Sequence, residues 1–351
     1  MIVLGIETSC DETSASLVKD GCELLSVVTA SSMDLHVAYG GVVPEIAARS
    51  HIESIIPVIN EAVSVVGWDK IDAIAVTYGA GLGTSLLVGV MTARTLAIAK
   101  SKPLYAVNHV EGHVYANFIS KTSLPGYKLP AKIPEFPILA VIVSGKHTQL
   151  VLFKDHFEYD VLGKTRDDAI GEAFDKVAKI LGLPYPGGPS VSKAAENGDP
   201  HKFKLPKARL EEKYDFSFSG LKTAVLRLAQ EQIGEDFTFP SFKLSSRLSE
   251  AQKCDIAASF QRIAVETIVD KTILAFKEFD PKCVIIAGGA SANLELRRQL
   301  SEKLPIPIDY TDVKLSTDNG AMIATLGHYM AINNVPTADP YTLDIEPGLK
   351  M

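Results

Sequence analysis

Cysteine is scarce in this sequence, with four residues among 351 and no C-x-x-C pair. This spacing excludes a zinc ribbon and a disulfide framework, and reduced thiols of a cytosolic protein are the simpler interpretation. The sequence also lacks a long apolar run, because the longest uncharged stretch, between Asp72 and Arg94, is interrupted by a polar, glycine-rich segment. Glu7 interrupts the apolar N-terminal segment, so no secretory signal is recognisable. We expect a cytoplasmic protein without a membrane segment.

An excess of basic residues is missing as well. The chain has 35 Lys and Arg against 42 Asp and Glu, which gives a net charge of −7. A protein that coats nucleic acid is therefore excluded, and any contact with RNA must come from a local patch. One basic stretch could contact an RNA backbone, although solvated surface is the alternative. It contains Lys202, Lys204, Lys207, Arg209 and Lys213.

The two halves of the chain repeat one pattern of elements. Three short strands joined by tight turns are predicted at 2–28 and again at 138–162, each followed by alternating helices and strands. A duplicated β-β-β-α-β-α-β-α unit predicts an α/β protein of two similar lobes that face each other across a central cleft. A proline-rich linker at 122–137 separates the lobes. We therefore place the N-terminal lobe at 1–132 and the C-terminal lobe at 133–324. The latter carries an insertion at about 185–253, and the tail, about 325–351, is free to pack back on the first lobe.

Four polar or glycine-rich loops fall at matched positions of this repeat. The loops 7–13 and 144–148 each join the first two strands of a lobe, and the loops after Thr77 and Ala287 each lie between a strand and a helix. Proteins of the actin, sugar kinase and Hsp70 type hold nucleotide phosphates with such hairpins, and backbone N–H groups at helix starts attract anions. An ordinary turn explains any one of these loops equally well. Four of them at matched positions favour a nucleotide-binding cleft.

His109 and His113 are four residues apart at the start of a predicted helix, so their side chains share one face. This spacing suits two ligands of one metal ion, and a helix-cap histidine beside a core histidine is the alternative. Asp318 starts the last helix of the second lobe as the histidine pair starts that of the first. The pseudo-symmetry therefore predicts that the two helix starts face each other across the cleft. Two histidines and a carboxylate leave coordination positions open and suit Fe(II) or Zn(II).

Asp11 and Glu12 are adjacent acids on a loop that is expected to bind phosphate. Two carboxylates repel a phosphate, so their presence there needs another reason. A general base, or a contact with an incoming nucleophile, is one such reason, and a solvated turn is the alternative.

Eight ordered motifs cover nearly the whole chain: GIETSCDET (5–13), YGGVVPE (39–45), NHVEGH (108–113), GEAFDK (171–176), YPGGP (185–189), FSFSGLK (216–222), GGASAN (288–293) and TDNGAM (317–322). Together they resemble the tRNA adenosine threonylcarbamoyltransferases of the bacterial type, the TsaD family, formerly named O-sialoglycoprotein endopeptidases. The resemblance implies the actin-like, ribonuclease H-like two-lobed fold. It also implies transfer of a threonylcarbamoyl group from threonylcarbamoyl-AMP to N6 of adenosine 37, with release of AMP, in tRNAs that read codons beginning with A.

The resemblance also assigns residues and partners. It implies that His109, His113 and Asp318 hold a divalent metal ion, Fe(2+) by resemblance, with Zn(2+) as the second choice. The substrate nucleotide would be bound by Ser144, Gly145, Lys146, His147, Thr148, Asp175, Gly188 and Asn293. In this reaction Asp11 or Glu12 is our choice for positioning or deprotonating the adenosine amine. The implied partners are tRNA, a TsaB-like actin-fold protein and a TsaE-like ATPase.

The chain departs from the family pattern at two positions. Lys146 stands where the family has the second glycine of Ser-Gly-Gly-His-Thr, and Ala80 stands where it usually has proline. We expect a side chain at 146 to crowd the ligand, to require a positive φ, or to add a charge near phosphate.

Two other functions compete with the transferase. A metallopeptidase would use the histidine pair, but Glu111 is not adjacent to His109, so H-E-x-x-H is absent. A nucleotide-binding scaffold without chemistry would have no use for the metal ligands or for Asp11 and Glu12.

Overall fold

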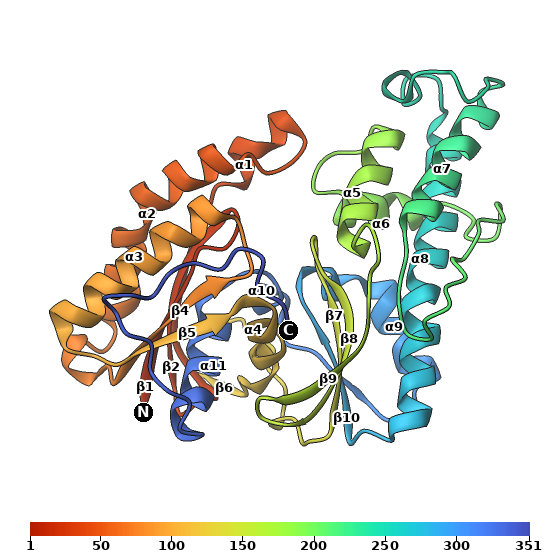
Figure 1. Ribbon diagram of the computed structural model, residues 1–351. Coiled ribbons are helices and arrows are strands. Elements are labelled where there is room, and N and C mark those ends of the chain that lie inside the picture. Colours follow the sequence, from red (N-terminus) through yellow and green to blue (C-terminus); the bar gives the residue numbers. More distant parts are fainter. The chain divides into compact units, whose positions relative to one another are not determined.

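The computed structural model describes residues 1–351 apart from the side chain of Ala38, and the chain divides into two compact units. The first unit consists of residues 1–135 and 309–351, and the second of residues 136–308. Each unit is built on its own β-sheet (Figure 1). Among the residues that the structure describes, no helix has both the length and the apolar character that a membrane crossing requires.

The sheet of the first unit has the strand order β5-β4-β1-β2-β3-β6. β1, β2 and β3 form an antiparallel meander, and β4 and β5 continue it in parallel on the other side of β1. The tight turn between β2 and β3 is made by Asp20 and Gly21, both with positive φ. The strands are β1 (Ile2–Glu7), β2 (Glu12–Lys19), β3 (Glu23–Ser31), β4 (Ala73–Gly79), β5 (Leu104–Asn108) and β6 (Lys121–Thr122).

Helices cover both faces of this sheet, which is why β1 is apolar almost throughout. Leu4 and Ile6 pack with side chains of α2 and α3, whereas Gly5, on the opposite face, lies against α11. A Cβ atom at Gly5 would lie 2.0 Å from the carbonyl oxygen of Gly320, so only glycine lets α11 approach β1 this closely. The helices are α1 (Met33–His36), α2 (Pro44–Ser64), α3 (Gly83–Lys100), α4 (His109–Tyr115), α10 (Val313–Ser316) and α11 (Gly320–Ile332).

The second unit repeats this arrangement with the strand order β11-β10-β7-β8-β9. Its strands are β7 (Ile138–Val143), β8 (Thr148–Asp155), β9 (Glu158–Lys164), β10 (Cys283–Ala287) and β11 (Ile308–Asp309). Its helices are α5 (Ile170–Leu181), α6 (Gly187–Ala195), α7 (Ser219–Gln232), α8 (Glu250–Phe279) and α9 (Leu294–Lys303). The long helix α8 starts at a capping box formed by Ser249 and Gln252. Short 3-10 helices occur at Val37–Tyr39, Trp68–Lys70, Ala116–Phe118, Ser241–Lys243 and Gly289–Ala292.

The matching order β3-β2-β1-β4-β5 and β9-β8-β7-β10-β11 confirms the duplicated α/β architecture that the sequence predicts. One boundary differs. We expected residues 309–324 in the C-terminal lobe, but they belong to the first unit. The reason is that α11 buries its residues from Gly320 to Tyr329 and packs against β1 and β2 of the first sheet.

Candidate metal centre and substrate-binding site

The histidine pair lies at the point where β5 gives way to α4. Asn108 caps this short helix, since its side chain accepts a hydrogen bond from the backbone N–H of Val110 at 2.9 Å. Asn319 plays the same part for α11 and accepts from the N–H groups of Ala321 and Met322 at 3.0 and 3.1 Å. Asp318 immediately precedes this second cap. Two helix starts, each fixed by an asparagine, therefore carry the three expected metal ligands.

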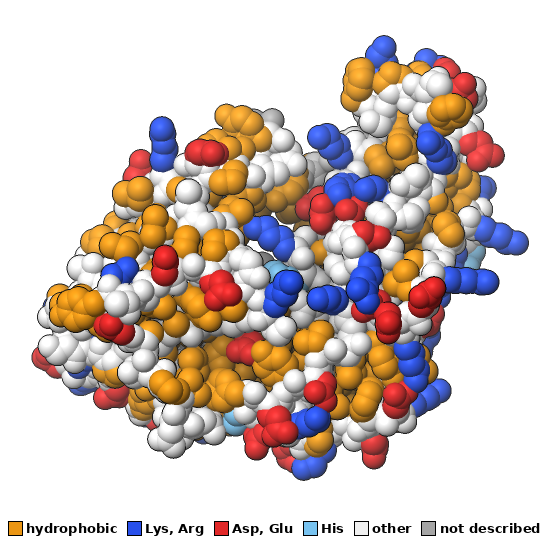
Figure 2. Space-filling model, in the orientation of Figure 1, with side chains coloured by type: hydrophobic (Ala, Val, Ile, Leu, Met, Phe, Trp, Pro, Cys, Tyr) orange, Lys and Arg blue, Asp and Glu red, His pale blue; other side chains and the backbone are white. Residues whose placement is uncertain are grey.

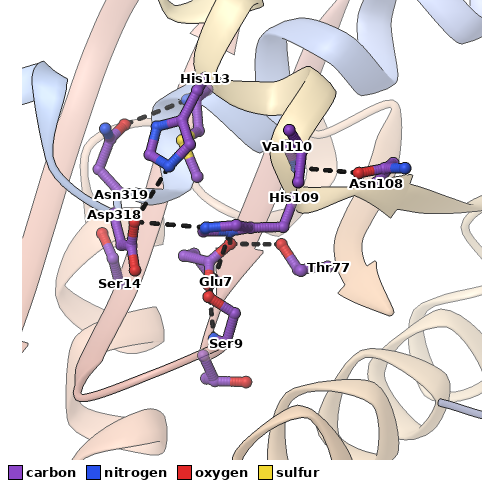
Figure 3. Close-up of polar contacts among 12 residues, drawn as sticks. Glu7, Ser9, Ser14, Thr77, Asn108, His109, Val110, His113, Asp318 and Asn319 are labelled. Atoms are coloured by element: carbon purple, nitrogen blue, oxygen red, sulfur yellow. Dashed lines mark hydrogen bonds and ion pairs between the residues drawn. The ribbon is translucent and has the colours of Figure 1, made fainter. Parts of the chain in front are cut away.

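These three side chains come together in the first unit (Figure 3). Oδ1 of Asp318 is 3.5 Å from Nε2 of His109 and 3.3 Å from Nε2 of His113. The ligand atoms of the three residues all lie within 4.8 Å of one another. The expectation that Asp318 faces the histidines from the other lobe is wrong, because α11 packs beside α4 on the first sheet.

Glu7 holds the far side of the His109 ring. Its carboxylate oxygen Oε2 is 3.1 Å from Nδ1 of His109 and accepts a hydrogen bond from the Thr77 hydroxyl at 2.5 Å, while Oε1 accepts from the backbone N–H of Ser9 at 2.5 Å. Glu7 is fully buried, and burial acts to raise its pKa, but the neighbouring His109 holds that pKa below its ordinary value. A carboxylate on Nδ1 directs Nε2 toward Asp318, which is the arrangement typical of metal-bound histidines.

The His113 side chain is 2% exposed, and its Nε2 faces the Asp318 carboxylate at 3.3 Å. Among the residues that the structure describes, neither ring nitrogen has a hydrogen-bond partner. An imidazole buried in this way is costly, and a metal ion bound to Nε2 would offset the cost. The donor set of two histidines and one carboxylate suits Zn(II) or Fe(II). The residues present therefore fit a divalent metal ion.

Glu12 begins β2, at the end of the loop that it shares with Asp11. Its carboxylate oxygen Oε2 is buried and has no hydrogen-bond partner among the residues that the structure describes. Burial, together with the negative charges of Asp318, Asp11 and Glu7, raises the pKa of Glu12 to about 8. The structure thus places a carboxyl group that can hold or release a proton near neutral pH beside the candidate metal ligands.

In the second unit, the expected nucleotide loop 144–148 is a tight connection between β7 and β8. The Ser144 hydroxyl accepts from the backbone N–H groups of Lys146 and His147 at 3.3 and 3.0 Å. Thr148 is buried, and its hydroxyl accepts from the N–H of Ile170 at the start of α5, at 2.8 Å. Lys146 is exposed and is not among the non-glycine residues with positive φ. The expected need for a positive φ at Lys146 is therefore wrong.

A cavity of about 650 Å³ lies beside α5, α6, α8 and α9. Of the expected nucleotide-binding residues, Gly188 and Asn293 line it, whereas Asp175 and the loop 144–148 are not part of its wall. A Cβ atom at Gly188 would meet no atom within 4 Å. Asp175 instead accepts a hydrogen bond from the N–H of Gly187 at 2.7 Å, and burial raises its pKa.

Sequence reasoning missed two polar side chains in this wall, Ser192 and Gln261. Gln261 lies in the middle of α8, and its Oε1 accepts from the Ser192 hydroxyl at 2.8 Å and from Nδ2 of Asn293 at 3.1 Å. Glu7 was also missed as a partner of His109. Its position in an otherwise apolar strand could have suggested a buried role.

The basic stretch expected to contact RNA is partly neutralised. Lys207 forms ion pairs with Glu266 and Asp270, at 2.8 and 2.7 Å, and Lys213 pairs with Glu278. Lys202, Lys204 and Arg209 are exposed.

A family model and the curated relatives of this chain agree on one family. A family model described as TsaD, tRNA N6-adenosine threonylcarbamoyltransferase, matches residues 23–325. A relative from Thermomicrobium roseum is 49% identical over 345 residues and spans 95% of this chain and 93% of its own. One from Dehalococcoides mccartyi is 46% identical over 353 residues and spans 100% and 99%. Both are named tRNA N6-adenosine threonylcarbamoyltransferase.

Solved structures show the fold. HypF of T. kodakarensis has a TM-score of 0.59 at 14% identity, over 95% of this chain and 48% of its own. Full-length HypF in the phosphate- and nucleotide-bound form has a TM-score of 0.56 at 14% identity, over 94% and 55%. With the matching sheet orders of the two units, these likenesses support the actin-like fold that the sequence predicts.

Proposed function

This chain belongs to the tRNA N6-adenosine threonylcarbamoyltransferase family and is a transferase that modifies tRNA; from that premise we propose a metal-dependent reaction with threonylcarbamoyl-AMP as donor. The acceptor is N6 of adenosine 37 in tRNAs that read codons beginning with A, and AMP is released. The observation that carries the metal dependence is the grouping of His109, His113 and Asp318 beside Glu12.

His109, His113 and Asp318 would hold the ion, Fe(2+) or Zn(2+). When bound, such an ion acts as a Lewis acid that neutralises negative charge on a phosphate group and on the departing AMP. Glu7 keeps His109 in the orientation that presents Nε2 to the ion.

The adenosine N6 attacks the carbamoyl carbon of the donor, and the bond between that carbon and the phosphate oxygen breaks. AMP leaves with the electron pair of that bond, and the proton lost by N6 passes to a carboxylate. Glu12 suits this step better than Asp11, because its pKa of about 8 lets it take a proton near neutral pH. Asp11 remains the choice for positioning the amine.

The adenosine part of the donor fits the cavity of the second unit. A volume of about 650 Å³ is within the range of small-molecule sites, and its wall combines apolar side chains with a few polar groups. Asn293 and Gln261 supply amide groups there, and Gly188 leaves its side of the wall open.

The test is reconstitution. Purified protein is incubated with threonine, bicarbonate, ATP, the adenylate-forming enzyme and unmodified tRNA, with and without partner proteins, and the tRNA nucleosides are separated and weighed by mass spectrometry. We expect threonylcarbamoyladenosine with the wild type and with the control Glu111→Gln, and strongly reduced amounts with Glu12→Gln and His113→Ala. Undetectable product with the wild type and all partners present would contradict the proposal. Cleavage of a protein substrate that needs Glu111 would support a metallopeptidase instead.

We also propose that a protein partner binds the first unit. Large apolar side chains are exposed along α2 and α3, where orange atoms gather at the left of Figure 2. Ile52 and Ile56 of α2 are 64% and 53% exposed, and Leu87 and Met91 of α3 are 46% and 47% exposed. Exposed apolar groups that gather in this way indicate a protein interface, which suits a TsaB-like actin-fold partner. We further propose that a TsaE-like ATPase is a second partner and that the protein acts in the cytoplasm.

The partner surface is tested with the double variant Ile52→Asp, Ile56→Asp. Co-elution with the TsaB-like protein in size-exclusion chromatography should be lost. The matched control Leu294→Asp, which changes an exposed leucine of the second unit, should co-elute as the wild type does. If the double variant still co-elutes with the TsaB-like protein, the partner binds another surface.

A further inference from the structure

Two buried histidines outside the ligand set contact the loop that carries Asp11 and Glu12. His36, the last residue of α1, and His51, in α2, are both 0% exposed. Neither has a part in the metal cluster or in the proton transfer proposed above. His51 contacts the backbone of that loop directly. His36 is linked to it through a hydrogen bond with Ser32, which in turn contacts the loop.

His51 bridges two ends of the stretch 10–13. Its Nε2 is 3.0 Å from the carbonyl oxygen of Cys10, and its Nδ1 is 2.7 Å from the hydroxyl oxygen of Thr13. A carbonyl oxygen can only accept, so Nε2 carries the proton, and in a neutral ring Nδ1 accepts from the Thr13 hydroxyl. Burial lowers the pKa of His51, which favours this neutral ring.

His36 acts on the next residue of the loop. The backbone N–H of Val43 donates to its Nδ1 at 3.2 Å, so the proton of the neutral ring is on Nε2, which donates to the Ser32 hydroxyl oxygen at 3.1 Å. The Ser32 hydroxyl then donates to the carbonyl oxygen of Asp11 at 2.8 Å, and the Ser32 N–H donates to the same oxygen at 3.0 Å. Each group in this chain therefore donates to the next, from Val43 at the start of α2 through His36 and Ser32 to the carbonyl oxygen of Asp11.

Other elements also hold the backbone of the loop, and one of them shares the Cys10 carbonyl oxygen with His51. The N–H of Leu82 donates to the carbonyl oxygen of Ser9 at 2.8 Å, and the Ser85 hydroxyl donates to that of Cys10 at 3.2 Å. Among the described residues, the buried Glu12 oxygen Oε2 has no hydrogen-bond partner. Burial, and then the charges of Asp318, Asp11 and Glu7, raise the pKa of Glu12. Since that oxygen has no partner of its own, the backbone must keep the carboxyl group in place.

We propose that His51 is a positioning residue of the transfer reaction. It fixes the loop backbone so that Asp11 and Glu12 meet the adenosine amine, and His36 supports the same backbone through Ser32. This inference rests on the proposed function, because it takes these two acids as the groups that act on the amine. His51 contacts neither a metal ligand nor the expected nucleotide-binding residues. Its loss should therefore affect the transfer step far more than binding.

The experiment compares His51→Leu with His51→Gln, whose amide N–H can replace the donor to the Cys10 carbonyl. His201→Leu, an exposed histidine of the second unit, is the matched control. Single-turnover transfer, donor affinity and metal content are measured on each full-length variant. We expect His51→Leu to slow transfer about 100-fold, the cost of a displacement of roughly 1 Å at a reacting group. Donor affinity and metal content should change by no more than about twofold, and His51→Gln should recover about tenfold of the rate.

Two results would overturn the inference. One is a His51→Leu variant that transfers as fast as the wild type. The other is a variant in which rate, donor affinity and metal content fall together and His51→Gln gives no recovery, since this means a merely structural role. Should His51→Leu not fold, the ring itself is read in the wild type by long-range 15N–1H NMR on histidine-labelled protein, where Nε2–H is expected and Nδ1–H contradicts the proposal.

The proposed function fails in a different way. If the wild type makes no modified adenosine, or if Asp11→Asn and Glu12→Gln both transfer at the wild-type rate, the reaction or its base assignment is wrong. The NMR result for His51 is read independently of either outcome.

Discussion

Glu12 combines burial, an unpartnered oxygen and three acidic neighbours, and each of these disfavours its charged form. With a pKa of about 8, the carboxyl group is mostly protonated at pH 6 and mostly ionised above pH 9. A general base works only when ionised, so the single-turnover rate should rise about tenfold per pH unit below pH 7 and level off above about pH 9. Stopped assays across about pH 6 to 10 at saturating donor measure this profile.

Glu12→Gln should lower the plateau and remove the inflection, because the amide cannot take a proton. Asp11→Asn is the companion variant, and its profile should keep the inflection even if its rate is lower. An inflection that persists unchanged in Glu12→Gln would assign the titration to another group.

Glu7 gives a prediction about the metal ion. Its carboxylate is 3.1 Å from Nδ1 of His109 and receives hydrogen bonds from Ser9 and Thr77. Replacing such an outer carboxylate weakens metal binding, and we expect Glu7→Gln to lower the affinity for Zn(2+) about 10- to 100-fold. Competition with a chromophoric chelator measures the affinity. Glu111→Gln, on the same helix as His109, is the control and should bind as the wild type does.

The candidate metal ligands could be predicted from the sequence, but the residues that support them could not. The spacing of His109 and His113 on one helix face is a local property of the sequence. Glu7 was interpreted only as an interruption of an apolar segment, because its partners Thr77 and His109 are 70 and 102 residues away in the chain. The contacts of His51 with Cys10 and Thr13 were hidden in the same way, because these residues are 41 and 38 positions away in the chain.

At the scale of elements, residues 338–351 cross the first unit and are fastened to α3 by Arg94. Its guanidinium donates to the carbonyl oxygens of Pro340, Tyr341 and Leu343, at 2.6, 2.6 and 3.0 Å. Farther along, the tail reaches the site, since Asn108 donates to the carbonyl oxygen of Lys350 at 3.3 Å. This segment therefore braces the cap of the helix that carries the histidine pair.

Arg94→Ala should destabilise the first unit by roughly 2 kcal/mol, because three carbonyl groups lose a charged donor. Arg94→Lys should recover only part of this, since an ammonium group cannot contact three carbonyl oxygens with a planar fork. Urea unfolding followed by circular dichroism gives the stability, and limited proteolysis shows whether the tail is released. Equal stability of wild type and Arg94→Ala would show that the tail is held by its other contacts alone.

The strands, turns and helix starts could be predicted because their residue patterns are local in the sequence, and because each half of the repeat supported the prediction for the other. The sheet against which α11 packs could not be predicted. Which sheet a helix packs against depends on close approaches such as that of Gly5 to Gly320, which no local pattern reveals. This one packing choice moved Asp318 from the second lobe to the first and brought the ligands together.

At the scale of the whole molecule, the expected metal ion and the expected nucleotide have their binding residues in different units. His109, His113 and Asp318 lie in the first unit, and the cavity with Gly188 and Asn293 lies in the second. A ligand that binds the folded state stabilises it by about 2.7 kcal/mol at 100 times its dissociation constant. Since chains of two units often unfold in more than one step, metal and AMP should act on different steps.

We therefore expect Zn(2+) added to chelator-treated protein to raise the thermal transition of the first unit by several degrees, roughly 3 °C per kcal/mol, and AMP to raise that of the second. The tryptophan of the chain, Trp68, belongs to the first unit, so its fluorescence reports that transition separately, while calorimetry records both. Asp318→Asn should abolish the response to Zn(2+) and keep the response to AMP. Asn293→Ala should do the reverse, because Asn293 lines the cavity and is not part of the metal cluster. A Zn(2+) response that survives in Asp318→Asn would place the ion elsewhere, and an AMP response confined to Trp68 would remove the nucleotide from the second unit.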